Sequence, residues 1–144
     1  MTAELHEAAA TLMRDSARRY TPGRRRLVEI LARAGKPLAI PDILRGRRDL
    51  AQSSAYRNLA ALERAGVVRR VLTDEEFGLY ELTEELTEHH HHLICSSCGR
   101  VEDVAIPADL EDTVDRTLDR LARRAGFATV SHRLDLIGRC ERCA

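Results

Sequence analysis

Two pairs of cysteines constrain the fold of the second half of this chain more than any other feature. Cys95 and Cys98 form one CxxC pair, Cys140 and Cys143 form another, and there is no fifth cysteine. Each CxxC turn places two thiolates within reach of one ion, and two such turns make the four-thiolate shell of a structural zinc site. The sequence therefore predicts that zinc joins the end of the chain to the start of a C-terminal domain. A pair of redox-active dithiols is the less favoured alternative, because neither pair has a thioredoxin-like context.

A run of histidines, residues 89–92, leads directly into the apolar pair Leu93-Ile94 and the first cysteine pair. Successive side chains of an extended strand point to opposite faces. His89 and His91 would then face one way and His90 and His92 the other, so the run can supply two ligands to each of two metal ions. An affinity tag is not expected, because a tag would lie at a terminus. The remaining alternative to a metal site is a solvated run on an edge strand.

The distribution of charge indicates two domains with different partners. Residues 1–72 carry 15 Lys and Arg against 7 Asp and Glu, whereas residues 73–144 carry 8 against 16, so the net charge of zero combines a basic and an acidic half. A basic half is typical of a domain that binds a polyanion such as DNA; an Arg-rich surface that only confers solubility is the alternative. No apolar run approaches the roughly 20 residues of a membrane span. With no signal-peptide pattern, we expect a cytoplasmic protein with reduced thiols.

The first half has the pattern of a winged helix-turn-helix. Apolar spacing and breakers predict helices at 4–19, 24–34, from about Pro41, and at 54–65, the last one capped by a serine pair. Strands are expected at 67–72 and 77–82 across a polar tip, 73–76. In a winged helix-turn-helix, the last of these helices lies in the major groove of DNA and is called here the reader helix. The residues that we expect to contact bases or phosphates are Arg24, Gln52, Ser53, Ser54, Tyr56 and Arg57, against the alternative of an ordinary helix surface.

The second half has the pattern of a small α/β domain. Beyond an acidic linker, 83–88, strands are expected at 101–106 and 128–136 around a helix at 109–126 with Val114, Leu118 and Leu121 inward. The expected domains are therefore 1–82 and 89–144, joined by the 83–88 hinge.

Three stretches together, HHHHLICSSCG, GFATVSHRLDLIGRCERC and SAYRNLAALERAGVVRR, resemble the ferric uptake regulator (Fur) family of bacterial metal-responsive repressors. The resemblance extends over about residues 20–143. It implies an α+β fold, with an N-terminal winged helix-turn-helix domain followed by a small α/β dimerisation domain that holds a four-cysteine zinc site. It further implies a homodimer that binds an inverted-repeat operator in double-stranded DNA when loaded with a regulatory divalent metal, with no small-molecule substrate and no membrane partner.

The resemblance also implies which residues bind metal. Cys95, Cys98, Cys140 and Cys143 match the structural zinc ligands. Glu81, His90, His92 and Asp103 match a regulatory site at the hinge. A second site would use His89, His91, His132 and a carboxylate, for which Glu111 or Asp109 is available because Leu110 occupies the expected offset.

The chain departs from the patterns of known subgroups. Iron- and peroxide-responsive members take a histidine from the DNA-binding domain, where residues 36–38 here read Lys-Pro-Leu. Zinc-responsive actinobacterial-type members use an aspartate in the reader helix and a cysteine near the hinge, where Arg64 (beside Glu63) and Thr83 occur. We expect Zn²⁺ as the regulatory metal, with Fe²⁺, Mn²⁺ or a peroxide response as alternatives.

The metal ligands of this chain are also compatible with two other classes of function. A zinc hydrolase is disfavoured because no separate general base is evident. A metal-buffering protein that does not read DNA is the other alternative. His6, alone near the N-terminus, is expected to be exposed; folding over the hinge is the alternative.

Overall fold

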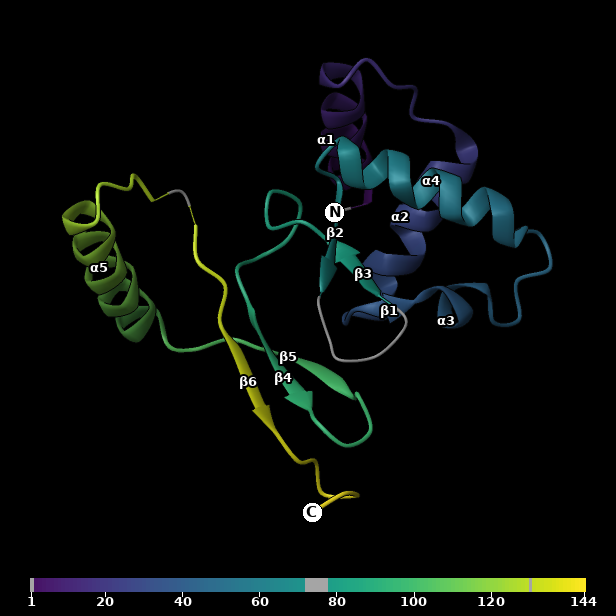
Figure 1. Ribbon diagram of the computed structural model, residues 1–144. Coiled ribbons are helices and arrows are strands. Elements are labelled where there is room, and N and C mark those ends of the chain that lie inside the picture. Colours follow the sequence, from purple (N-terminus) through teal and green to yellow (C-terminus); the bar gives the residue numbers. More distant parts are fainter. Residues whose placement is uncertain (1, 72–77, 130) are drawn as a thin grey trace. The chain divides into compact units, whose positions relative to one another are not determined.

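The computed structural model describes residues 2–71, 78–129 and 131–144 (Figure 1). The chain divides into two compact units, Met1–Glu88 and His89–Ala144. Each unit has its own three-stranded sheet, with strand order β1-β3-β2 in the first and β5-β4-β6 in the second. Within the described ranges, no helix is long and apolar enough to cross a membrane.

The first unit has the element order of a winged helix. Its elements are α1 (Thr2–Asp15), α2 (Pro22–Ala34), β1 (Leu38–Ala39), α3 (Ile40–Leu44), α4 (Gln52–Arg64), β2 (Val68–Val71) and β3 (Leu79–Leu82). β3 pairs antiparallel with both β1 and β2. The expected hairpin is therefore present, although its polar tip (73–76) and the residues Leu72 and Phe77 lie outside the described residues. The short β1 was not expected from the sequence.

Local sequence explains where α2 begins and ends, whereas α4 begins differently from expectation. Thr21 caps α2 by accepting the N–H of Arg24 at 3.4 Å, Pro22 stands at its first position, and left-handed Gly35 ends it. The expected serine cap of α4 is wrong. This helix begins at Gln52, after Ala51 and without a side-chain cap, so both serines lie inside its first turn.

The core of the first unit holds α4 firmly against its neighbours. Leu59 and Leu62 of α4 are fully buried with Leu27 and Val28 of α2 and with Val68 of β2. Burying each such aliphatic side chain contributes about 1.5–3 kcal/mol. The outer face of α4 is thus presented to solvent from a rigid support.

His6 of α1 lies in this unit and is buried, which contradicts the expectation of an exposed residue. Its side chain is 4% exposed. Nδ1 lies 2.6 Å from the hydroxyl of Tyr20, and Nε2 lies 3.2 Å from Oε1 of Glu29. Two polar partners thus compensate the burial of the imidazole, and Glu29 connects α1 to α2.

The second unit is built around β4 (His91–Cys95). β4 pairs antiparallel with β5 (Val101–Val104) and parallel with β6 (Asp135–Gly138), and α5 (Ala108–Arg124) connects β5 to β6. The predicted strand 128–136 is wrong over most of its length: residues 128, 129 and 131–134 are not in a strand, and residue 130 lies outside the described residues. β5 also ends two residues before the predicted strand.

The described residues of the second unit do not cover the apolar stripe of α5, so the prediction of an inward face is wrong. No residue of α5 is buried, and Leu118 and Leu121 are 38% and 55% exposed. Leu136 and Ile137 of β6 are exposed as well. The helical period was identified correctly, but the second unit alone does not provide the surface that this stripe would pack against.

Candidate metal centres and nucleic-acid interface

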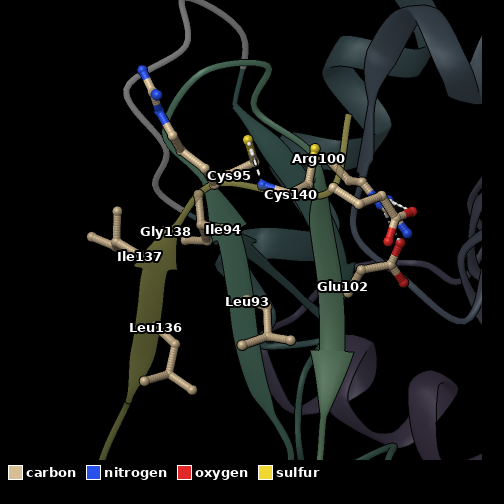
Figure 2. Close-up of a pocket in the computed structure, with 11 residues that line it drawn as sticks. Leu93, Ile94, Cys95, Arg100, Glu102, Leu136, Ile137, Gly138 and Cys140 are labelled. Atoms are coloured by element: carbon tan, nitrogen blue, oxygen red, sulfur yellow. Dashed lines mark hydrogen bonds and ion pairs between the residues drawn. The ribbon is translucent and has the colours of Figure 1, made fainter. Parts of the chain in front are cut away.

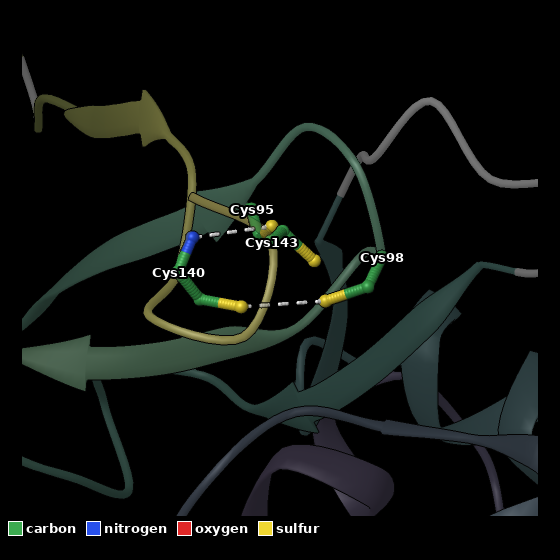
Figure 3. Close-up of side chains that lie close together, drawn as sticks. All are labelled: Cys95, Cys98, Cys140 and Cys143. Carbon is green, nitrogen blue, oxygen red and sulfur yellow. Dashed lines mark hydrogen bonds between the residues drawn. The ribbon is translucent and has the colours of Figure 1, made fainter.

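The four cysteines come together at one end of the second sheet, where the turns after β4 and β6 meet (Figure 3). The sulfur atoms lie within 4.8 Å of one another. Those of Cys98 and Cys140 are 3.8 Å apart, and the backbone N–H of Cys140 donates to the sulfur of Cys95 at 3.4 Å. The geometry suits a single tetrahedral ion with four thiolate ligands, as the spacing predicted.

The electrostatics of this cluster favour a thiolate at Cys95. Backbone N–H groups, first that of Cys140 and then those of Cys98 and Ser97, lower the pKa of Cys95 from 9.0 to about 6. Hydrogen bonds with Cys140 and Cys98, together with burial, raise the pKa of Cys143 to about 12. The backbone N–H of Arg142 is the main cause that lowers the pKa of Cys140 as well. Two thiols of the group are thus favoured as thiolates, and an ion bound by four sulfurs would also require Cys98 and Cys143 to lose their protons.

An open groove runs from the cysteines along β4 and β6 (Figure 2). Its apolar lining residues include Leu93, Leu136 and Ile137. At its cysteine end, Arg100 donates to Glu102 at 2.8 Å and to Glu141 at 3.2 Å. Because Glu141 follows Cys140, Arg100 helps to hold the second CxxC turn beside β5.

A second cluster gathers three histidines around Glu111. One oxygen of this carboxylate lies 2.9 Å from Nε2 of His89 and 2.7 Å from Nε2 of His132, and the other lies 2.8 Å from Nε2 of His91. Burial alone would raise the pKa of Glu111, but hydrogen bonds and charge from His91 and His89 lower it overall. Of the two carboxylates considered from the sequence, Glu111 joins this group, and Asp109 is exposed outside it.

A buried ring nitrogen indicates that this second cluster suits a cation. Nε2 of His132 is buried and has no hydrogen-bond partner among the described residues; Nδ1 of His91 also has none, but it is Nε2 of that ring that faces Glu111. Nε2 of His132 lies close to Glu111 but outside hydrogen-bond geometry. A ring nitrogen and a carboxylate oxygen that face each other without a hydrogen bond are arranged as two ligands of one ion would be. Imidazole and carboxylate are ordinary zinc ligands.

A third cluster lies on the other side of the histidine run. Nε2 of His90 and Nε2 of His92 lie 3.8 and 3.7 Å from the carboxylate oxygens of Asp103, which stands opposite His92 on β5. His92 also places Nδ1 at 3.3 Å from Asp135 of β6. The alternation predicted for the run is therefore observed, even though only its last two residues belong to β4. Asp135 was missed, because its approach depends on the parallel pairing of β6 with β4.

Glu81, the remaining predicted ligand, belongs to the first unit. It lies on β3, is 6% exposed, and accepts a bond from Nε of Arg69 on β2 at 2.8 Å. Its predicted partnership with His90, His92 and Asp103 of the second unit stays a prediction.

The predicted DNA-contacting residues lie mainly on the first turns of α4. Gln52, Ser53, Tyr56 and Arg57 are exposed there, and Ser54 is half-buried and accepts from Arg57 at 3.5 Å. Arg24 lies on α2, is half-buried and donates from Nε to Asn58 of α4 at 3.2 Å. Arg24 thus helps to hold α4 against α2, and its contact with DNA stays a prediction.

Comparison with known proteins gives a consistent family assignment. The model of the ferric uptake regulator family matches residues 15–137. The ferric uptake regulation protein of Legionella pneumophila is 32% identical over 101 residues, which cover 70% of this chain and 69% of that protein.

Solved structures share the fold. The Helicobacter pylori ferric uptake regulator, described with three functional metal-binding sites, superposes with a TM-score of 0.75 at 22% identity, covering 99% of this chain and 93% of that one. A zinc uptake regulator in complex with zinc and DNA gives a TM-score of 0.61 at 22% identity, covering 99% and 94%.

Proposed function

The chain belongs to the ferric uptake regulator family, and from this we propose that it is a metal-dependent, DNA-binding repressor of metal-homeostasis genes that responds to zinc. Proteins of this family are transcription regulators and not enzymes; they bind DNA and act as dimers. The proposal therefore concerns the regulatory metal, the residues that bind it and the way in which they control DNA binding.

The observation that carries the proposal is the division of the histidine run into two clusters. His89 and His91 face Glu111 and His132, whereas His90 and His92 face Asp103. Imidazole and carboxylate ligands, and a separate four-cysteine cluster, are the donor set that a zinc-dependent regulator needs. Fe²⁺, Mn²⁺ and a peroxide response remain alternatives, because the same ligands also bind those ions.

We propose that Glu81 joins His90, His92 and Asp103 in the regulatory site. Glu81 ends the wing of the DNA-binding domain, 1–82, and the histidines begin the dimerisation domain, 89–144, so the 83–88 hinge lies between them. A bound divalent ion would supply a common centre for ligands from both domains. Because ligands from both domains share that ion, the range of angles at the hinge is restricted. The two reader helices of a homodimer must stand about 34–36 Å apart to enter successive major grooves of an inverted-repeat operator. Fewer accessible hinge angles mean a larger population with the competent spacing.

Selection from random duplex DNA, followed by fluorescence anisotropy on the enriched sequence, tests the proposal. Protein that retains only its tightly held zinc is titrated separately with Zn²⁺, Mn²⁺ and Fe²⁺. We expect Zn²⁺ to give tight, salt-sensitive binding, His90→Ala to abolish the response, and Arg57→Ala to lose DNA without losing metal. Activation only by Fe²⁺ or Mn²⁺ would change the assigned metal.

DNA binding that is independent of every ion would refute metal control. The absence of any enriched duplex would instead favour a cytoplasmic metal buffer. His89→Ala is a matched comparison for His90→Ala, because it removes a neighbouring imidazole that faces the other cluster.

A further inference from the structure

We propose that two carboxylates, Asp115 and Asp135, are positioning residues, one for each histidine cluster. Each holds Nδ1 of one histidine and leaves Nε2 of the same ring directed at the cluster. The inference rests on the proposed function, because it takes both clusters to bind metal ions.

Asp115 acts on His132. It stands one turn of α5 after Glu111, so both carboxylates point from the same face of the helix. Nδ1 of His132 lies 2.8 Å from Oδ1 of Asp115, and Nε2 lies 2.7 Å from Oε1 of Glu111. The ring therefore spans two carboxylates with distinct surroundings: Asp115 is 59% exposed, whereas Glu111 is 17% exposed among three histidines.

The same arrangement recurs at His92 with a different element. β6 lies parallel to β4 with Asp135 directly beside His92. Nδ1 of His92 is 3.3 Å from Oδ1 of Asp135, and Nε2 is 3.7 Å from Oδ1 of Asp103. A helix supplies the outer carboxylate in one cluster and a strand supplies it in the other.

The chemistry of imidazole explains what these outer carboxylates do. A neutral ring carries one N–H and one lone pair, and only the lone pair can bind a metal. A carboxylate at Nδ1 accepts the N–H there, which places the lone pair on Nε2, fixes the plane of the ring and increases the basicity of the ligand nitrogen. Asp115 and Asp135 thus preorganise His132 and His92 without touching the ion.

Metal titration of the full-length protein in the presence of a chromophoric chelator tests the roles separately. We expect Asp115→Ala to weaken Zn²⁺ binding at the Glu111 cluster by about 10–100-fold, with no effect at the Asp103 cluster, and Asp135→Ala to do the reverse. Asp115→Asn should recover part of the affinity, because its amide oxygen can still accept the N–H of His132. Asp112→Ala is the matched control, since it removes the same charge from the same helix one residue after Glu111.

A spectroscopic readout separates positioning from a general loss of structure. With Co²⁺ in place of Zn²⁺, Asp115→Ala should alter the ligand-field bands of the Glu111 cluster, whereas Asp112→Ala should leave these bands unchanged. Neither substitution should change the far-UV circular dichroism spectrum. If Asp115→Ala and Asp112→Ala have equal affinities and spectra, the positioning role of Asp115 is refuted. If Glu111→Ala itself leaves metal binding unaltered, the second metal site of the proposed function is refuted, and the role of Asp115 with it.

Discussion

Removing Arg69 from its ion pair with Glu81 should destabilise the first unit. The two residues stand opposite each other on β2 and β3, with Nε of Arg69 2.8 Å from Oε1 of Glu81. Their side chains are only 21% and 7% exposed, and Arg69 lies 3.5 Å from Glu84 as well. We expect Arg69→Gln to destabilise this unit, because it takes a guanidinium away from a buried carboxylate.

The exposure of the pair sets the size of the effect. Removing one partner of a fully buried ion pair costs about 3–5 kcal/mol, whereas an exposed pair contributes about 0–1 kcal/mol. Arg69 retains some contact with solvent, so we place the loss between these limits, at about 2 kcal/mol. For a domain of this size, about 1 kcal/mol shifts Tm by about 4–8 °C, so Tm should fall by about 8–16 °C.

Urea and thermal unfolding of protein that retains only its tightly held zinc, followed by far-UV circular dichroism, measures this loss. Arg70→Gln is the matched control: Arg70 is 50% exposed, lies 3.3 Å from Glu63 and stands over the ring of Tyr80. Its loss should cost under about 1 kcal/mol. Added salt should weaken the contribution of Arg70 more than that of Arg69. Equal destabilisation by the two variants would refute the reasoning from burial.

Three further perturbations test other parts of the molecule. Cys143→Ser should release the tightly held zinc and destabilise the second unit, because structural zinc contributes folding free energy; a stable dimer that retains its zinc, measured by elemental analysis and light scattering, would contradict the four-thiolate site. Leu59→Ala should lower the free energy of unfolding by about 2–5 kcal/mol in urea titrations, since Leu59 is fully buried. Burial, opposed by Arg25, raises the pKa of Tyr20 from 10.0 to about 12. The folded chain thus holds the phenol proton more tightly than the unfolded chain, so this contribution is complete below about pH 10 and is lost as the pH rises towards 12. Unfolding free energies measured across this range should fall less steeply in Tyr20→Phe, and identical slopes would contradict the assignment.

Several features followed from the sequence because they depend on short-range rules. The division of the histidine run needs only the alternation of an extended chain, and His89 to His92 obey it. The four-thiolate zinc site was expected because each CxxC turn, Cys95–Cys98 and Cys140–Cys143, can present two thiolates to one ion. The end of α2 at Ala34 follows from Gly35, whereas its start at Pro22, after the Thr21 cap, lies two residues before the predicted start.

Other expectations were wrong where the outcome depended on what packs nearby. A serine pair can cap a helix, but α4 begins earlier, at Gln52, and takes no side-chain cap. His6 was expected in solvent, yet Tyr20 and Glu29 provide the polar partners that its burial requires. The apolar period of α5 was identified correctly, but a period shows that a face is apolar and not what covers it.

The sequence by itself determined the order of the elements other than the short β1, the alternation of the histidines and the chemistry of the metal ligands, because these depend on residue type and spacing along the chain. Only the tertiary structure decided that Glu111 rather than Asp109 meets His89, His91 and His132, and that Asp115 and Asp135 lie behind His132 and His92. These contacts join residues of α5 and β6 to β4 and to the residues just before it in the chain. They depend on strand pairing and on the rotation of a helix about its axis, which spacing along the chain does not specify.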